Sequence, residues 1–336
     1  MTRADIGIDL GTANVMIYIS KKGIVLDEPS VVSIDTRNKE VIAIGHDAKK
    51  MIGKTPGYIE TIRPIRDGVI SNFSATESML KHFIERVLDK KGLGIYFMPR
   101  IMVCVPSGLT DIERRAVEQA TKGAGAREVY IIEETIAAAV GAGVDISEAN
   151  GRMIIDIGGG TTDIAVISLG GIVEFESLKI AGDKFDDEIV KYVKDKHNVL
   201  IGDKSAEKLK INIGKVYGDF YGEAMVGGRD VITRLPKGVN ITSYEINKAL
   251  DRSVNTIIST IRKVMDKTPP ELISDIAETG IVLTGGGALL RGLAEKIEYN
   301  LKTQVIVPEN PTTCVAKGTG ETLNSLDLLK IAKGNK

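Results

Sequence analysis

Residues 6–14 read Ile-Gly-Ile-Asp-Leu-Gly-Thr-Ala-Asn, and residues 154–163 read Ile-Ile-Asp-Ile-Gly-Gly-Gly-Thr-Thr-Asp. Each stretch is a short apolar run containing an Asp, followed by Gly and hydroxyl residues and then by a second apolar run. This pattern predicts a strand, a tight turn and a second strand. Glycine lets backbone N–H groups approach an anion closely because it has no Cβ. The sequence therefore predicts two phosphate-binding hairpins in one chain.

An acidic residue precedes the turn in both stretches. Asp9 and Asp156 cannot contact phosphate directly because like charges repel, but carboxylates hold Mg²⁺ and its waters. The two residues are 147 positions apart (156 − 9), a normal domain length, so two halves are expected to hold a metal–nucleotide from both sides. A third strand-to-glycine pattern, residues 281–292, predicts a turn at 285–287 on which a flat ring or a ribose could lie.

Composition favours a soluble two-domain α/β protein. The chain has 336 residues, 43% of them hydrophobic, and its 44 basic and 45 acidic residues give a net charge of −1. That balance gives no general attraction to nucleic acid, and 4% aromatics without Trp argues against base-stacking platforms. Cys104 and Cys314 lack metal or redox spacing and are expected to be small core residues of a reducing compartment. No signal peptide or bilayer-length apolar run is visible, which predicts a cytoplasmic protein.

Three helices are readable from their periodicity. Residues 76–88 place their apolar side chains on one face, and a helix from about 245 to 267 is ended by Pro269. Thr110 and Glu113 form a capping box that starts a third helix, ending near Gly123. The expected apolar stripe of this third helix is Ile112, Ala116, Val117 and Ala120.

Two glutamates stand where another helix begins, after the strand-like residues 131–132. Glu133 and Glu134 precede a run of small residues that would allow close helix packing at a hinge. A carboxylate aimed at the cleft would orient or deprotonate the water that attacks a γ-phosphate. The alternative is a carboxylate that only offsets the helix dipole.

The order of these motifs is similar to that of the actin, sugar-kinase and heat-shock-ATPase superfamily. Within it, the chain resembles the bacterial actins of the MreB/Mbl family along nearly its whole length. The stretches that carry the resemblance are Asp9-Leu-Gly-Thr-Ala-Asn14, Glu28-Pro-Ser-Val-Val32, Ile52-Gly-Lys-Thr-Pro56, Ile62-Arg-Pro-Ile-Arg-Asp-Gly-Val-Ile70, Asp156-Ile-Gly-Gly-Gly-Thr-Thr162, Lys267-Thr-Pro-Pro-Glu-Leu272 and Leu283-Thr-Gly-Gly-Gly287.

The resemblance implies an α/β, actin-like fold of two similar domains around a nucleotide cleft. Each domain would have a mixed β-sheet flanked by helices, plus an inserted subdomain. Domain I is expected over residues 1–144 and 317–336, with its insertion at about 33–72. Domain II is expected over residues 145–316, with its insertion at about 181–243.

The same resemblance implies ATP or ADP with Mg²⁺ as cofactors, and it assigns site residues by position. Asp9 and Asp156 would hold Mg²⁺ through water, and Glu134 and Thr162 would position the attacking water. The residues expected to bind the nucleotide are Gly11, Thr12, Ala13, Asn14, Gly158, Gly159, Gly160 and Thr161 at the phosphates, Glu207 and Lys210 at the adenosine, and Gly286 and Gly287 at the adenine.

Two positions depart from the family pattern. Thr135 stands where the family usually has Pro, and Asp163 stands where it usually has Glu. Thr135 keeps a backbone N–H that Pro lacks, and Asp163 is one methylene shorter. Nucleotide binding is expected to be unaffected, whereas the hydrolysis rate, the preference for ATP over GTP and the paralogue identity stay open.

An apolar segment, residues 93–98, has basic residues on both sides and is followed by Pro99, which favours an extended loop. Its side chains either cover the adjacent core or dip into an anionic bilayer surface. The resemblance favours the second reading and implies membrane contact through Leu93, Tyr96 and Phe97.

The resemblance also implies a homopolymer of paired protofilaments, with Ile112 near the contact between them. The expected function is a filament-forming ATPase that assembles at the inner face of the cytoplasmic membrane and organises cell-wall synthesis with elongation proteins. A small-molecule kinase needs an acceptor pocket with a base, for which no signature is visible. A chaperone-type ATPase needs a following substrate domain, and only 16 residues follow Gly320 (336 − 320).

Overall fold

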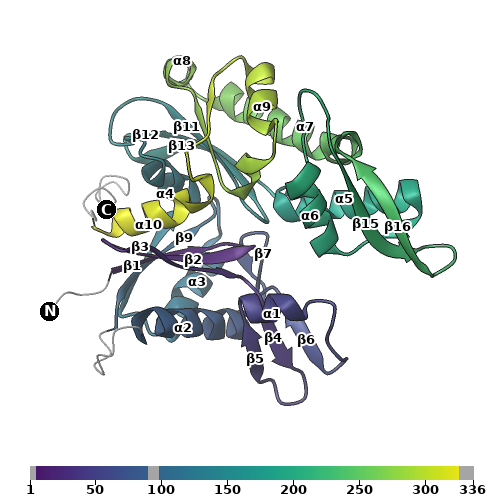
Figure 1. Ribbon diagram of the computed structural model, residues 1–336. Helices are drawn as coiled ribbons and strands as arrows, with labels where there is room; N and C mark the ends of the chain where they lie inside the picture. The colour runs from purple at the N-terminus through teal and green to yellow at the C-terminus, as the bar shows by residue number, and fades with distance from the viewer. Residues whose placement is uncertain (1–4, 90–97, 325–336) are drawn as a thin grey trace. The chain divides into compact units, whose positions relative to one another are not determined.

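The computed structural model describes residues 5–89 and 98–324 (Figure 1). The chain forms two compact units. Unit 1 comprises Met1–Asn150, Ile167–Val173 and Thr312–Lys336, and unit 2 comprises Gly151–Val166 and Glu174–Pro311. Among the described residues, no helix combines the length and the apolar character needed to cross a bilayer.

Unit 1 is built on a five-stranded mixed sheet that contains the first predicted hairpin. β1 pairs antiparallel with β2, which confirms the hairpin, and β1 pairs in parallel with β9, as β9 does with β10. In spatial order the strands are β3 (Gly23–Pro29), β2 (Asn14–Ile19), β1 (Asp5–Leu10), β9 (Arg100–Val105) and β10 (Glu128–Glu133).

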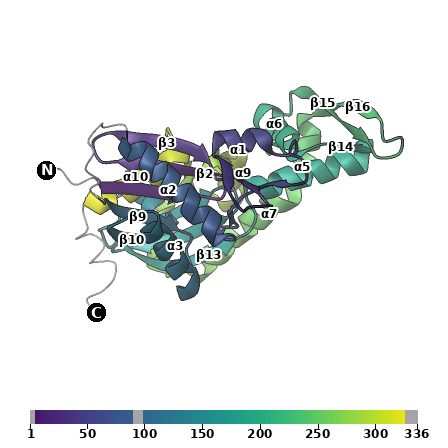
Figure 2. The same ribbon diagram turned by 90° about the horizontal axis from the view of Figure 1, so that it is seen from below.

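Helices cover both faces of this sheet. α2 (Phe73–Asp89) and α3 (Asp111–Gly123) pack together on one face, which Figure 2 shows from below. α4 (Glu134–Gly141) and α10 (Cys314–Asn324) lie on the other face, with α10 against β1, β2 and β9. The predicted apolar face of α2 is confirmed, because its residues Met79, Leu80, Phe83 and Ile84 are buried.

The predicted start of α3 is confirmed, but its predicted apolar stripe is partly wrong. Thr110 and Glu113 form the reciprocal capping box, and the buried residues of α3 are Val117, Ala120 and Thr121. Ile112 is 81% exposed. At 3.6 residues per turn it lies roughly 130° around the helix from the centre of the buried face, so it points into solvent.

Unit 2 repeats the strand order of unit 1. In both sheets three strands that follow one another in the chain are joined by two later ones, and β11 pairs in parallel with β17 as β1 does with β9. In spatial order the strands of unit 2 are β13 (Gly171–Leu178), β12 (Thr162–Ser168), β11 (Arg152–Ile157), β17 (Ile281–Thr284) and β18 (Val305–Ile306).

Helices pack against the unit 2 sheet and form a large apolar core with it. The predicted helix near 245–267 is α7 (Ser243–Lys267), whose face of Ile246, Leu250, Val254 and Ile257 is buried. The other helices of this unit are α5 (Gly182–His197), α6 (Asp203–Ile213), α8 (Pro270–Thr279), α9 (Leu293–Leu301) and the 3-10 helix η1 (Gly286–Leu289).

Each unit also carries a smaller sheet. The strands in unit 1 are β4 (Val32–Asp35), β5 (Val41–Ile44) and β6 (Ile59–Ile62), with α1 (His46–Met51) beside them and the pair β7 (Ile65–Arg66) and β8 (Val69–Ile70) after them. The strands in unit 2 are β14 (Val199–Leu200), β15 (Glu223–Asp230) and β16 (Pro236–Thr242). A short 3-10 helix, η2 (Pro311–Thr313), precedes α10.

The closest helix packing in unit 1 is between α4 and α10. A Cβ added at Gly141 would lie 1.8 Å from the carbonyl oxygen of Cys314, and one added at Gly318 would lie 1.8 Å from that of Ala137. The two helices therefore meet backbone to backbone, which the small residues of α4 make possible.

This contact predicts that Gly318→Ala destabilises the protein although alanine favours helix. The helix-propensity gain of about 1 kcal/mol is outweighed by the clash with Ala137, so the free energy of unfolding should fall by about 2 kcal/mol in net terms. Gly57→Ala is the matched control, since a Cβ there meets nothing within 4 Å. Urea unfolding of both variants measures the difference, and equal midpoints would contradict the packing argument.

Candidate functional site

The first glycine turn joins β1 to β2 and is fixed from both sides. A Cβ at Gly11 would lie 2.8 Å from the carbonyl oxygen of Asn14, so this position admits no side chain. The Ser30 hydroxyl donates to the Gly11 carbonyl at 2.6 Å, and the Thr12 hydroxyl accepts from the Gly68 backbone N–H at 3.1 Å. The turn is therefore held in one conformation before any ligand binds.

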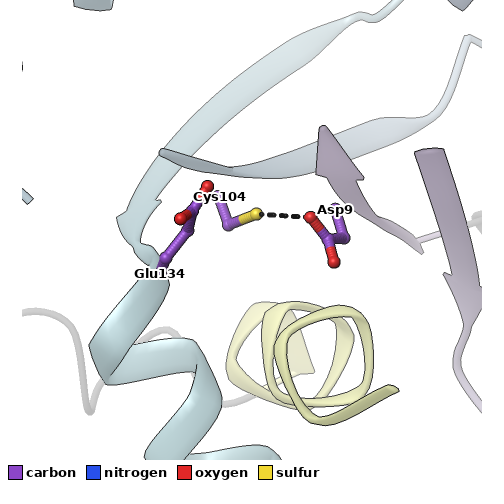
Figure 3. A group of neighbouring side chains, drawn as sticks. All are labelled: Asp9, Cys104 and Glu134. Atoms are coloured by element: carbon purple, nitrogen blue, oxygen red, sulfur yellow. Dashed lines mark hydrogen bonds between the residues drawn. The ribbon is translucent and has the colours of Figure 1, made fainter. Parts of the chain in front are cut away.

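Asp9 lies beside two other acidic groups in unit 1. Ligand atoms of Asp9, Cys104 and Glu134 all lie within 4.8 Å of one another, and Figure 3 shows the three side chains converging from β1, β9 and the start of α4. The Cys104 thiol donates to Asp9 Oδ1 at 3.4 Å. Burial, together with the charges of Asp9 and Glu134, raises the pKa of Cys104 well above its usual value, so the group is a neutral thiol at pH 7.

Cys104 is buried as predicted, but its place beside Asp9 was missed by the sequence reasoning. A usable signal exists. Asp9 and Cys104 are both the fifth residue of their strands, and these strands pair in parallel from Asp5 with Arg100. When the first residues of two parallel strands are paired, residues at the same position along each strand become neighbours.

Glu134 is placed by the junction of β10 and α4. The helix begins directly after the strand, with Glu133 as its N-cap, and Glu134 is only 8% exposed. Glu133 points elsewhere and pairs with Arg114 at 2.7 Å. Thr135, one of the two departures from the family pattern, is buried with its hydroxyl 3.2 Å from that of Ser107.

The second glycine turn, residues 158–161, joins β11 to β12. Gly158 N–H donates to the Thr161 carbonyl at 2.9 Å and closes the turn. The start of α5 fastens it, because the backbone N–H groups of Gly182 and Asp183 donate to the carbonyls of Gly158 and Gly159 at 3.2 and 2.8 Å.

Thr162, the first residue of β12, is fully buried and its hydroxyl donates to the Ile180 carbonyl at 2.6 Å. A hydroxyl that donates once still has lone pairs with which to accept a hydrogen bond. Asp163, the second departure, is fully buried next to it.

Asp156 occupies in unit 2 the position that Asp9 has in unit 1. It is level with Thr284 on β17, whose hydroxyl donates to Asp156 Oδ1 at 2.7 Å. Burial raises the pKa of Asp156 to about 6, although the hydrogen bond from Thr284 acts in the opposite direction. A desolvated carboxylate of this kind is stabilised by a neighbouring cation.

Lys210 on α6 connects two parts of the unit 2 site. Its ammonium donates to the Gly182 carbonyl at 2.8 Å and pairs with Asp186 Oδ1 at 2.9 Å. Burial raises the pKa of Asp186 to about 6, against the opposing effect of Lys210. Glu207 lies one turn earlier on the same helix. The predicted adenosine-contacting helix is thus joined to the backbone that holds the second glycine turn.

The third glycine turn separates two roles. Gly285 has a φ of 79°, and a Cβ there would lie 2.3 Å from the Ile157 carbonyl oxygen. A Cβ at Gly287 would lie 2.2 Å from Ile157 Cγ2, whereas one at Gly286 would meet nothing within 4 Å. Gly285 and Gly287 therefore serve close packing, and Gly286 leaves an open backbone surface.

The predicted site residues fall into two groups, one in each unit. Unit 1 contains Asp9, Gly11, Thr12, Ala13, Asn14 and Glu134, and unit 2 contains Asp156, Gly158, Gly159, Gly160, Thr161, Thr162, Glu207, Lys210, Gly286 and Gly287. Ile112 is on α3 and belongs to neither group. Leu93, Tyr96 and Phe97 lie outside the described residues.

The donor chemistry of both groups fits Mg²⁺. The ion prefers oxygen ligands and keeps several of its waters, and Asp9, Glu134 and Asp156 offer carboxylate oxygens. Within each unit the carboxylate beside the glycine turn, Asp9 or Asp156, would suit a hydrated ion, whose chemistry is to neutralise charge on phosphate oxygens.

The pKa of Asp156 yields a stability prediction for Asp156→Asn. The folded state binds the proton more tightly than the unfolded chain, with a pKa of about 6 against 3.8, so stability falls as pH rises between these values. Above pH 6 the buried carboxylate costs about 3 kcal/mol. Asparagine removes that cost and can still accept from Thr284, so thermal unfolding of the ligand-free protein should occur at higher temperature at pH 7.5.

The gain from Asp156→Asn should vanish below about pH 4, where the carboxyl group is protonated in both states. Asp219→Asn is the control, because Asp219 is exposed. A gain that is equal at pH 4 and pH 7.5, or that also appears in the control, would contradict burial as its cause.

Comparisons with known proteins place this geometry in a family. Residues 3–331 match the family described as MreB/Mbl protein. The chain is 48% identical over 330 residues to the cell shape-determining protein Mbl of Bacillus subtilis (strain 168), covering 98% of both. It is 49% identical over 332 residues to the cell shape-determining protein MreB of Escherichia coli (strain K12), covering 96% of this chain and 94% of that protein.

Solved structures agree. MreB 5 of Spiroplasma citri bound to AMPPNP matches with a TM-score of 0.91 and 38% identity, covering 97% of this chain and 98% of its own. The ADP-bound form matches with the same TM-score and covers 99% of both. A MamK chain, 21% identical with a TM-score of 0.81, shares the fold. This chain has an actin-like fold and belongs to the MreB/Mbl family.

Proposed function

We propose that the protein is an ATP-binding, filament-forming bacterial actin that assembles at the inner face of the cytoplasmic membrane. There it organises cell-wall synthesis with elongation proteins and so maintains cell shape. The observation that carries the proposal is the repeated sheet, in which a carboxylate and a glycine turn follow one another at the same place in both units. Relatives named as cell shape-determining proteins and a relative bound to AMPPNP and to ADP support it.

Domain boundaries follow from the same reading. Domain I takes residues 1–144 and 317–336 with its insertion at about 33–72, and domain II takes 145–316 with its insertion at about 181–243. The small sheets β4–β6 and β14–β16 lie within these insertions.

The proposal assigns a part in nucleotide binding to residues of both groups, and relatives bound to AMPPNP and to ADP support it. The backbone N–H groups of the turns 11–14 and 158–161 bind phosphate oxygens, and Asp9 and Asp156 hold Mg²⁺ through its waters. Glu207 and Lys210 contact the adenosine, and the open surface at Gly286, next to Gly287, receives the adenine.

ATP hydrolysis, coupled to polymerisation, uses Glu134 and Thr162. In this proposal both residues position the attacking water, and the Thr162 hydroxyl, which donates to the Ile180 carbonyl, still has lone pairs with which to accept from it. This orients the water toward the γ-phosphorus, and Glu134 accepts its proton as the attack proceeds.

Two other classes of the superfamily compete with this proposal. A kinase would transfer the γ-phosphoryl group to a small acceptor, and a chaperone-type ATPase would release a bound peptide on hydrolysis. The names of the relatives favour the cytoskeletal class.

Sedimentation and electron microscopy on anionic lipid vesicles test the function. With ATP and Mg²⁺ the wild type should form paired filaments on the vesicles. Phe97→Ser should form filaments that stay in solution, because the apolar contact with the bilayer is lost and a filament multiplies each weak contact. ATP turnover without filaments at any concentration would overturn the proposal in favour of the other two classes.

Gly286→Val tests the adenine surface. A Cβ added at Gly286 would have no protein atom within 4 Å. The free energy of unfolding should therefore change by less than about 0.5 kcal/mol. The affinity for a fluorescent ATP analogue should fall at least tenfold, or about 1.4 kcal/mol, because the isopropyl group occupies the place of the ring. Gly57→Val is the matched control, and equal affinities in the two variants would refute the assignment.

Ile112→Ser tests the filament contact. The side chain is 81% exposed, so folding stability should change by less than about 0.5 kcal/mol. Protofilaments should still form but should appear single instead of paired in electron micrographs. Ile211→Ser, at another exposed isoleucine with 62% exposure, should leave the pairing intact. Paired filaments in the Ile112 variant would remove this residue from the interface.

A further inference from the structure

The cluster of Asp9, Cys104 and Glu134 contains a sulfur atom that the proposed function does not use. Its three side chains come from three elements, β1, β9 and the first residue of α4. The sheet fixes two of them side by side, and the strand-to-helix junction brings the third within 4.8 Å. Cys104 is 1% exposed and Glu134 is 8% exposed, so backbone structure and packing hold both in place.

The donor set suits a different class of cation from Mg²⁺. Mg²⁺ selects oxygen ligands, whereas Zn²⁺ and Co²⁺ combine thiolate with carboxylate oxygen. A tetrahedral zinc ion with bonds of about 2.3 Å to sulfur and about 2.0 Å to oxygen separates the two ligand atoms by about 3.5 Å. The distance from Cys104 Sγ to Asp9 Oδ1 is 3.4 Å. Two of the ligand atoms therefore already have the separation that such an ion requires.

The repeated sheet supplies an internal comparison. In both units the carboxylate accepts a hydrogen bond at Oδ1 from a side chain on the adjacent parallel strand. The donor is Cys104 for Asp9 and Thr284 for Asp156. In unit 2 that neighbour is a hydroxyl. The carboxylate therefore has an oxygen neighbour in unit 2 and a sulfur neighbour in unit 1, which also contains Glu134.

We propose that a thiophilic divalent cation of the zinc class binds directly to Asp9, Cys104 and Glu134 in the nucleotide-free protein. The metal–sulfur bond forms with release of the thiol proton to solvent. Three protein ligands leave a fourth position for water.

A consequence for regulation follows, and it rests on the proposed function. A zinc-class ion at this place engages Asp9, which the Mg²⁺–nucleotide needs, and Glu134, which the attacking water needs. Bound zinc would therefore inhibit ATP hydrolysis, and a chelator would restore it. Binding itself rests on the geometry of unit 1 alone.

Cobalt(II) is the probe for binding, because a thiolate–cobalt bond gives a charge-transfer absorption band that oxygen ligands do not give. Titration of the nucleotide-free full chain should produce this band in the wild type and in Cys314→Ser, and added Zn²⁺ should remove it. Cys104→Ser and Cys104→Ala should lack the band and bind Co²⁺ about tenfold more weakly or worse. Mutating a residue that only hydrogen-bonds to a metal ligand already lowers metal affinity by about 10- to 100-fold, and Cys104 is proposed as a ligand itself.

Glu134→Gln gives a second measurement that leaves the sulfur in place. This variant should keep the charge-transfer band but require a higher Co²⁺ concentration. Circular dichroism melting of each variant confirms that it is folded. A wild type without the band, or a band that persists in both Cys104 variants, would overturn the site.

Phosphate release by the wild type, with Mg²⁺ and with or without Zn²⁺, tests the consequence separately. Inhibition that a chelator reverses supports the regulatory role. Unchanged turnover in a protein that shows the cobalt band would overturn the inhibition but not the site. Absence of turnover even without Zn²⁺ would count against the proposed ATPase, and the cobalt spectrum would still decide the metal site.

Discussion

A carboxylate at the end of a parallel strand stands at the same place in both units, and in unit 2 it is held out of water. In unit 2 the burial of Asp156 makes its charged form unfavourable, and the hydroxyl of Thr284 offsets only part of that cost. A cation bound at this place relieves the cost and so stabilises the folded protein by mass action. The same burial that weakens the ligand-free protein would therefore favour the metal–nucleotide that we propose to bind there.

The surroundings of that carboxylate are rigid because backbone, and not only side chains, connects the parts. The Gly182 carbonyl accepts a hydrogen bond from the Lys210 ammonium, and the Gly182 N–H donates to the second glycine turn at the Gly158 carbonyl. The phosphate end and the base end of the proposed site in unit 2 thus share one residue of main chain. In unit 1 the first turn is fixed by Ser30 and by the Gly68 N–H, which come from later segments of the chain. Such preformed turns lower the ordering cost of binding an anion.

Local sequence patterns predicted the helices and the hairpin well. They predicted contacts between residues far apart in the chain less well. The hairpin β1–β2, the buried face of α2 and the capping box of α3 depend on residues close in the chain, and the sequence was sufficient for them. The prediction that Ile112 belongs to the apolar stripe of α3 was wrong. The spacing of apolar residues does not show that the buried face is formed by Val117, Ala120 and Thr121. The contact between Asp9 and Cys104 joins residues 95 positions apart, and only the pairing of β1 with β9 creates it. The same holds for Lys210 and Asp186, whose contact depends on how α5 meets α6.

The backbone contact between α4 and α10 gives the C-terminal helix mechanical influence over Glu134. From Glu134 to Gly141, α4 is about 10 Å long, and Gly141 and Ala137 sit against α10 without an intervening side chain. The middle of that contact, between Ala137 and Gly141, is about 7.5 Å from Glu134 at 1.5 Å of helix rise per residue, so a rotation of α4 by about 10° there would move Glu134 by roughly 1.3 Å. Such a displacement is about half of a hydrogen-bond length. The crossing of these two small-residue helices would therefore help to set the position of Glu134, the carboxylate proposed to orient the attacking water.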